Sequence, residues 1–75
     1  MEDKKTIFYR KIGENISNLR QQSGMTRREL AEKMKIRNSY LKRIEKGKAR
    51  KVKFTIILVL AKILKIKLSD VFEDT

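Results

Sequence analysis

The chain has 75 residues, 20 of them lysine or arginine and 9 of them aspartate or glutamate, and its formal net charge is +11. One domain of this length, residues 1–75, buries only roughly 60% of the surface that the unfolded chain exposes, so a large active-site cleft is not expected. The sequence contains neither cysteine nor histidine, which excludes disulfides and thiolate metal sites, removes the commonest general base, and argues against any metal or other cofactor.

A first helix is predicted from the spacing of four apolar residues. Phe8, Ile12, Ile16 and Leu19 recur every three or four positions, which places them on one stripe of a helix. The helix is expected to end near residues 23–24, where a glycine can take the left-handed conformation that stops a helix.

The most specific local signal in the chain marks the start of a second helix. Thr26 can accept a hydrogen bond from the backbone of Glu29, and the Glu29 carboxylate can reach back to the backbone of Thr26, which makes a capping box. Met25 and Leu30 occupy the two positions of a hydrophobic staple. The apolar residues that follow predict a helix of only about two turns, ending near Lys33.

A third short helix is predicted after a break near residues 35–36. Leu41 and Ile44 keep the helical spacing, and Gly47 offers a left-handed stop. Residues 48–53 hold four cations and no helical stripe, so we expect them to form a loop.

A fourth helix is expected over residues 55–64, followed by a short fifth helix near the C-terminus. The apolar stretch 54–64 is only about half the roughly 20 residues needed to cross a bilayer and contains Lys62, so it is interpreted as a buried helix. Ser69 is the expected N-cap of the fifth helix, with Asp70 in its first turn. The charged N-terminus lacks the pattern of a secretory signal. We therefore expect a cytosolic protein with no membrane span.

The positive charge is concentrated in the middle of the chain. Residues 1–25 carry a net +2, residues 26–53 a net +9, and residues 54–75 no net charge. The charge alone is equally consistent with a basic surface that is exposed to solvent and binds no partner. However, the same segment contains the predicted helix, short turn and helix at about residues 26–46, the arrangement that lets DNA-binding proteins place a helix in the major groove. Together the two signals indicate double-stranded DNA as the partner.

A longer pattern of residues runs along nearly the whole chain. Its parts are Ile12-Gly13-Glu14-Asn15-Ile16, Leu19-Arg20, Met25-Thr26, Glu29-Leu30-Ala31-Glu32-Lys33, Tyr40-Leu41-x-x-Ile44-Glu45-x-Gly47, Phe54, Ile57, Leu60-Ala61-x-x-Leu64-x-Ile66 and Leu68-x-x-Val71-Phe72. In this pattern the sequence resembles the lambda-repressor/Cro-like helix-turn-helix family. The resemblance implies an all-α fold, a compact five-helix DNA-binding domain.

The resemblance also implies which residues read the bases. Asn38, Ser39 and Arg43 fall where such proteins contact base edges, with Arg37 and Lys42 flanking them. Arg43 could pair bidentately with guanine and Asn38 with adenine, while Ser39 is permissive. Two alternatives stay open. Asn38 could be only the N-cap of the third helix, and Arg43 could be only a solvated cation.

Other cations are expected to hold the DNA backbone. Phosphates should meet the positive end of the second helix and the loop after the third helix. The residues concerned are Arg27, Arg28, Lys46, Lys48, Arg50 and Lys51. They would supply affinity for DNA but no sequence specificity. Tyr40 could contact DNA or pack on the second helix, and we assign it no role.

The resemblance assigns structural roles to further residues. Arg20 and Glu45 should form a partly buried ion pair that joins the first helix to the third. A homodimer is implied as well, although the residues that would form its interface are equally needed to close the core of so small a domain. The implied interface residues are Ile66, Leu68, Val71 and Phe72.

Three positions depart from the family pattern. Arg27 stands where glutamine is usual, which keeps a phosphate contact possible but should lose a side-chain bridge to the third helix. Lys35 replaces the usual turn glycine, at a cost of roughly 1–2 kcal/mol if the turn keeps its left-handed geometry. Val52 stands where proline is common, so the basic loop is expected to be more mobile in the unbound protein.

The leading prediction is a homodimeric transcriptional regulator, such as a phage-type repressor or a restriction-modification controller protein, on a (pseudo)palindromic operator. The alternative is an antitoxin that neutralises a protein partner and autoregulates its operon, although no separate arm for a toxin is evident. An enzyme is disfavoured because the four serines have no histidine partner and the carboxylates are scattered. The glycine breaks and the capping box disfavour a membrane-surface peptide. No small-molecule effector is expected.

Overall fold

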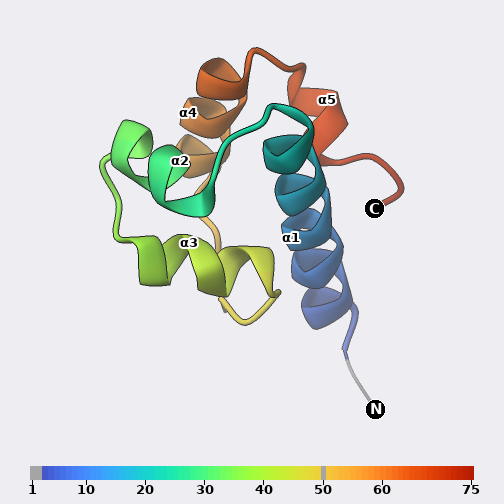
Figure 1. Cartoon of the computed structure of the whole chain (residues 1–75). Helices are drawn as coiled ribbons and strands as arrows, with labels where there is room; N and C mark the ends of the chain where they lie inside the picture. Colours follow the sequence, from blue (N-terminus) through green and yellow to red (C-terminus); the bar gives the residue numbers. More distant parts are fainter. Residues whose placement is uncertain (1–2, 50) are drawn as a thin grey trace.

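The computed structural model describes residues 3–49 and 51–75, and this part of the chain forms five helices and no strand (Figure 1). The helices are α1 (Lys4–Gln22), α2 (Arg27–Met34), α3 (Asn38–Glu45), α4 (Phe54–Leu64) and α5 (Leu68–Val71). The predicted all-α, five-helix architecture is confirmed.

Helix α1 begins at a side-chain cap and ends before a glycine turn. The Asp3 carboxylate accepts a hydrogen bond from the backbone N–H of Thr6 at 2.7 Å, which caps the helix. This bond lowers the pKa of Asp3 and keeps the cap ionised. After Ser23, the chain turns through Gly24 at φ +73°, as the sequence predicts. The predicted apolar stripe enters the core only from Ile12 onwards, because Phe8 is 39% exposed.

Helix α2 starts with the predicted capping box and ends at a strained residue. Glu29 donates its backbone N–H to Thr26 Oγ1 at 3.1 Å, and the backbone N–H of Thr26 donates to Glu29 Oε1 at 3.0 Å. The helix continues to Met34, and Lys35 then adopts φ 59°, ψ 40°. The turn therefore keeps its left-handed geometry without glycine. The backbone N–H of Ile36 donates to the carbonyl of Ala31 and closes the turn.

Helix α3 has Arg37, not Asn38, as its N-cap, and Arg37 makes no side-chain capping bond. The alternative that Asn38 serves only as the N-cap is therefore wrong: Asn38 is the first helical residue. At the other end Gly47 adopts φ +71°, the predicted stop. A Cβ at Gly47 would lie 2.8 Å from the Cα of Arg10, so glycine is also needed for the chain to pass α1.

The last two helices correct two expectations about their starts. Helix α4 begins at Phe54, one residue earlier than expected. Ser69 does not cap α5. Its N-cap position is Lys67, whose backbone N–H donates to the Asp70 carboxylate at 3.0 Å. Asp70 reaches back three residues and satisfies this N–H, so the N-cap position falls at Lys67, two residues before Ser69.

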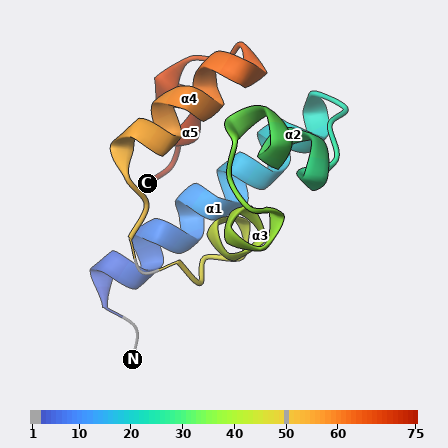
Figure 2. The same cartoon turned by 90° about the vertical axis from the view of Figure 1, so that its left-hand side faces the viewer.

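One core unites the five helices. The fully buried large side chains come from every helix and are Ile12, Ile16, Leu30, Leu41, Ile44, Leu60 and Val71. Helices α1 and α3 touch at Gly13, where any Cβ would collide with the backbone carbonyl of Ile44. In Figure 2, α4 lies above α1 and α3 lies below it, so α1 runs between the two helices. Helix α3 is thus held against α1 and α2 on its inner side alone.

Candidate nucleic-acid interface

Helix α3 has two faces with different chemistry. Its buried face consists of Leu41, Ile44 and Glu45, which contact the rest of the domain. The residues predicted to read bases all lie on the opposite, exposed side and at the start of the helix. They are Arg37, Asn38, Ser39, Lys42 and Arg43. The structure therefore leaves these five side chains exposed to solvent, on α3 and directly before it.

The expected pair of Arg20 and Glu45 is present and nearly buried. Arg20 Nε donates to Glu45 Oε2 at 2.7 Å, and Arg20 Nη2 donates to Glu45 Oε1 at 3.1 Å. The third nitrogen, Nη1, donates to the backbone carbonyl of Met25 at 2.8 Å. A bidentate pair of this kind fixes orientation as well as distance. It ties α3 to α1 and to the turn that precedes α2.

Arg27 corrects an expectation. Its Nε donates to Glu45 Oε1 at 3.1 Å, so Arg27 does bridge α2 to the third helix. The expectation was that arginine, in place of the usual glutamine, would lose the bridge. The longer arginine side chain instead reaches a carboxylate that Arg20 already holds. The Arg27 side chain is still 29% exposed at the start of α2. Arg27 can retain its hydrogen bond to Glu45 and donate its remaining N–H groups to a phosphate.

The remaining phosphate candidates lie around the rim of α3. Arg28, Lys46, Lys48 and Lys51 are all exposed, while Arg50 lies outside the described residues. Glu29 is an acidic neighbour at the start of α2. Its hydrogen bonds with the backbone and the hydroxyl of Thr26 lower its pKa, so it stays ionised in the cap. Arg27 and Arg28 outnumber this one negative charge at the helix start.

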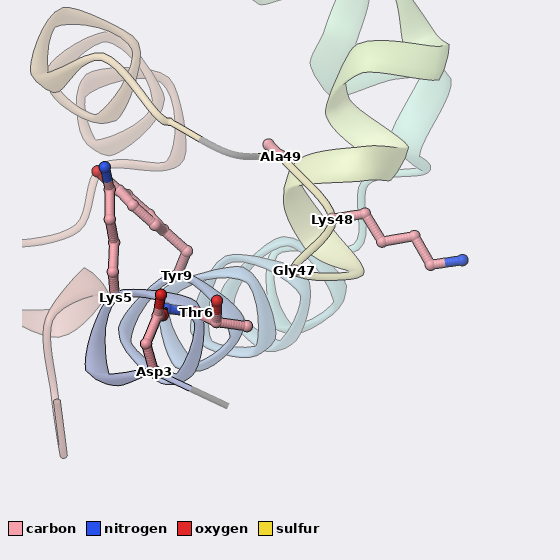
Figure 3. A pocket seen from close by; sticks show the side chains of 7 residues that line it. All are labelled: Asp3, Lys5, Thr6, Tyr9, Gly47, Lys48 and Ala49. Atoms are coloured by element: carbon pink, nitrogen blue, oxygen red, sulfur yellow. Dashed lines mark hydrogen bonds between the residues drawn. The ribbon is translucent and has the colours of Figure 1, made fainter. Parts of the chain in front are cut away.

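A hollow separates the start of α1 from the loop after α3. It has a volume of about 340 Å³ and is lined by Asp3, Lys5, Thr6, Tyr9, Gly47, Lys48 and Ala49. In Figure 3 the Lys48 side chain points away from those of Lys5 and Tyr9. The two cations therefore do not converge on one point. The hollow is therefore not a built ligand site.

A sequence model of the helix-turn-helix family matches residues 16–71. The chain belongs to this family. The match confirms the lambda-repressor/Cro-like membership predicted from the sequence. This helix-turn-helix protein is also similar to the restriction-modification controller protein C.AhdI from Aeromonas hydrophila, at 30% identity and a TM-score of 0.80, over 85% of this chain and 96% of that one. No curated protein matches the sequence.

Family membership and the exposed α3 face together establish the broad function. The protein is a DNA-binding transcriptional regulator. Among the described residues, no helix is long and apolar enough to cross a membrane. The same residues contain no cluster of acidic side chains that could hold a metal ion.

The residues predicted for dimerisation of the regulator have different environments. Val71 is fully buried in the core and cannot contact a partner, so its assignment to an interface is wrong. Ile66, Leu68 and Phe72 are half-buried and pack against the core. The sequence also missed Asn15, whose Nδ2 donates to the carbonyls of Val71 at 3.0 Å and Glu73 at 2.8 Å. No local signal marks this bond, because its partners are more than fifty positions apart in the chain.

Proposed function

We propose that two copies of this helix-turn-helix regulator bind a (pseudo)palindromic operator, each inserting α3 into a major groove. The observation that carries the proposal is the single exposed face of α3, on which five polar or charged side chains gather. Half-sites of such an operator lie roughly 34 Å apart on one face of the duplex. The dimer forms at least in part through Ile66, Leu68 and Phe72.

Base reading is assigned to the residues at the start and on the outside of α3. Arg43 pairs with guanine through two N–H groups, Asn38 pairs with adenine through its amide, and Ser39 accepts more than one base. Arg37 and Lys42 flank them. The exposure of all five residues supports this assignment, since none is committed to the core.

Phosphate binding is assigned to cations on two sides of α3. Arg27 and Arg28 stand at the start of α2, where the free N–H groups and the helix dipole favour an anion. On the other side, the residues after α3 contribute Lys46, Lys48 and Lys51, and Arg50, which lies outside the described residues, is assigned the same role from the sequence. These contacts position the protein and carry no sequence information.

The regulator acts as a repressor or controller protein without catalytic activity. This part of the proposal is supported by the likeness to a protein named as a restriction-modification controller. A cytosolic location follows, because bacterial operators lie there. Nothing in the described residues favours the antitoxin alternative.

Selection of bound duplexes from random DNA tests the proposal. We expect a consensus with two related half-sites. Arg43→Ala should weaken binding to that consensus by about 1–3 kcal/mol and relax one base position in each half-site. Lys62→Ala, which removes an exposed cation from α4 on the far edge of the molecule, is the matched control and should leave binding unchanged. Equal losses for Arg43→Ala on consensus and random DNA would refute its reading role.

A further inference from the structure

Helix α4 presents an apolar surface to solvent. Phe54, Leu58 and Val59 are 54%, 43% and 42% exposed. Phe54 and Leu58 are four residues apart and Val59 follows directly, so the three side chains lie on one side of the helix over about one and a half turns. The buried residues of α4, among them Ile57 and Leu60, lie on its other side. We call the surface of the three exposed residues the α4 face.

The charges next to the α4 face along the chain are all positive. Residues 46–69 contain eight lysines or arginines and no acid. Lys62 is exposed one turn after Leu58, and Lys53 and Lys65 are exposed directly before and after the helix. The apolar centre of the face is therefore bordered by cations.

The acidic residues of neighbouring elements do not neutralise this border. Asp70 and Glu73 line a hollow that α5 shares with α1. Asp74 lines a groove along the start of α1. Helix α2, which also packs against α4, carries more cations than acids. The acids at the end of the chain thus lie towards α1, and the α4 face keeps its positive border.

This chemistry favours one kind of occupant. A second copy of the chain would set cations against cations, so charge opposes pairing on this face. DNA offers phosphates but no matching apolar surface, and α4 lies on the other side of α1 from α3 (Figure 2). An anionic lipid surface is attracted most strongly to residues 26–53, which carry a net +9. A protein segment whose apolar residues are bordered by acids complements both features of the face.

We infer that the α4 face docks an acidic amphipathic helix of another protein. Such helices present apolar residues three and four positions apart. Phe54 and Leu58 have the same spacing, so the two helices can interdigitate. Acids beside the apolar stripe of the partner meet Lys53, Lys62 and Lys65. Because α3 lies on the other side of α1, the regulator can hold this partner while it is bound to DNA. The inference does not depend on how the regulator reads its operator.

The probe is a synthetic helical peptide of leucine, alanine and glutamate, with a leucine stripe bordered by glutamates. Labelled with fluorescein, it is titrated with the full chain at about 150 mM salt, where exposed charges more than roughly 8 Å apart are largely screened. A scrambled peptide of the same composition and a peptide with lysine in place of glutamate are the controls. The striped acidic peptide should bind at least about tenfold more tightly than either, because it alone matches the apolar centre and its border.

Variants of the chain locate the binding site. Phe54→Ser and Leu58→Ser should each raise the dissociation constant of the striped peptide at least about fivefold, because each removes apolar area that the peptide buries. Ile7→Ser is the matched control and should change it by less than about twofold, since Ile7 is 53% exposed but lies on α1. Thermal unfolding checks the fold of each variant. If one α4 variant unfolds, the other carries the comparison.

A saturating concentration of duplex DNA separates the α4 face from α3. The peptide should keep its affinity within about threefold when DNA is bound, because the two sites lie on different sides of α1. Displacement of the peptide by DNA would place it on α3 and overturn the inference. Equal binding of the scrambled peptide, or an equal effect of Ile7→Ser, would overturn it as well.

Two further results would assign the α4 face to another occupant and so contradict the inference. One is a dimer of the free chain that Leu58→Ser dissociates in sedimentation equilibrium, which would assign the face to a second copy. The other is binding to phosphatidylserine vesicles that Leu58→Ser abolishes, with no binding of the striped peptide. That result would assign the face to a lipid surface.

Discussion

Glu45 is a single carboxylate shared by two arginines from two other helices. Both oxygens are occupied, by Arg20 at 2.7 and 3.1 Å and by Arg27 at 3.1 Å, and the glutamate side chain is almost entirely buried. A buried ion pair is weak support for stability relative to a well-packed apolar core, because each charge loses its hydration. Removing one partner is different, since it leaves the others buried without a counter-charge.

Glu45→Ala should therefore lower the free energy of unfolding by about 3 kcal/mol, within the range for a broken buried pair. In a domain of this size such a loss lowers the melting temperature by more than about 10 °C. Thermal unfolding by circular dichroism measures it. Glu32→Ala, which removes an exposed carboxylate from α2, is the control and should shift the melting temperature little. A similar shift for the two variants would contradict the role of Glu45.

Single residues differ in how far their roles could be predicted. The pair of Arg20 and Glu45 was expected, but only through the family resemblance. The bond from Arg27 was not, because it depends on the distance between α2 and the end of α3, which no spacing in the sequence encodes. The burial of Val71 depends in the same way on how α5 packs, so an apolar residue of the core was assigned to an interface.

At the scale of elements, the ends of the helices were the most predictable feature. The capping box at Thr26 and the glycine stops at Gly24 and Gly47 involve groups at most four residues apart, so the sequence alone indicates them. The start of α5 was misplaced because Ser69 and Asp70 both suit a helix start. The tertiary fold decides between them by burying Val71 one turn after Lys67.

The left-handed residue at the end of α2 leads to a prediction about two glycine substitutions, which should change the free energy of unfolding in opposite directions. Lys35→Gly should raise the free energy of unfolding by about 0.5–1 kcal/mol, because glycine relieves the left-handed strain but loses more entropy on folding. Lys33→Gly, two residues earlier and inside the helix, should lower it by about 1 kcal/mol. Urea unfolding of both variants checks the pair. A destabilising effect of Lys35→Gly would show that the turn bears no strain.

At the scale of the whole molecule, charge and apolar surface are separated. Residues 26–53, which include α2 and α3, carry a net charge of +9. Residues 54–75, which supply α4 and α5, carry no net charge. This division was visible in the sequence, because charge can be counted along the chain. Where the exposed apolar residues gather was not visible, because a helical stripe does not show which of its turns extends past the core.

Salt dependence follows from this charge distribution. With six to ten phosphate contacts, operator affinity should fall on the order of 10³ to 10⁵-fold between about 50 and 200 mM salt. Lys48→Ala should reduce the slope of log K against log salt by about 0.9, and should weaken operator and random DNA alike. Fluorescence anisotropy over a salt series measures both effects, with Lys62→Ala as the control. A flat response in the wild type would contradict binding through the phosphates.

The two faces of α3 have a practical consequence. Of the eight residues of this helix, Leu41, Ile44 and Glu45 anchor it, Tyr40 is half-buried and packs against the core, and the other four are exposed to solvent. Because Gly13 and the arginine pair hold the anchoring residues, the exposed residues can be varied without loosening the scaffold. Randomising residues 37–39, 42 and 43 in a combinatorial library should yield regulators that fold alike and choose different operators, which makes this domain a starting point for reprogrammed specificity.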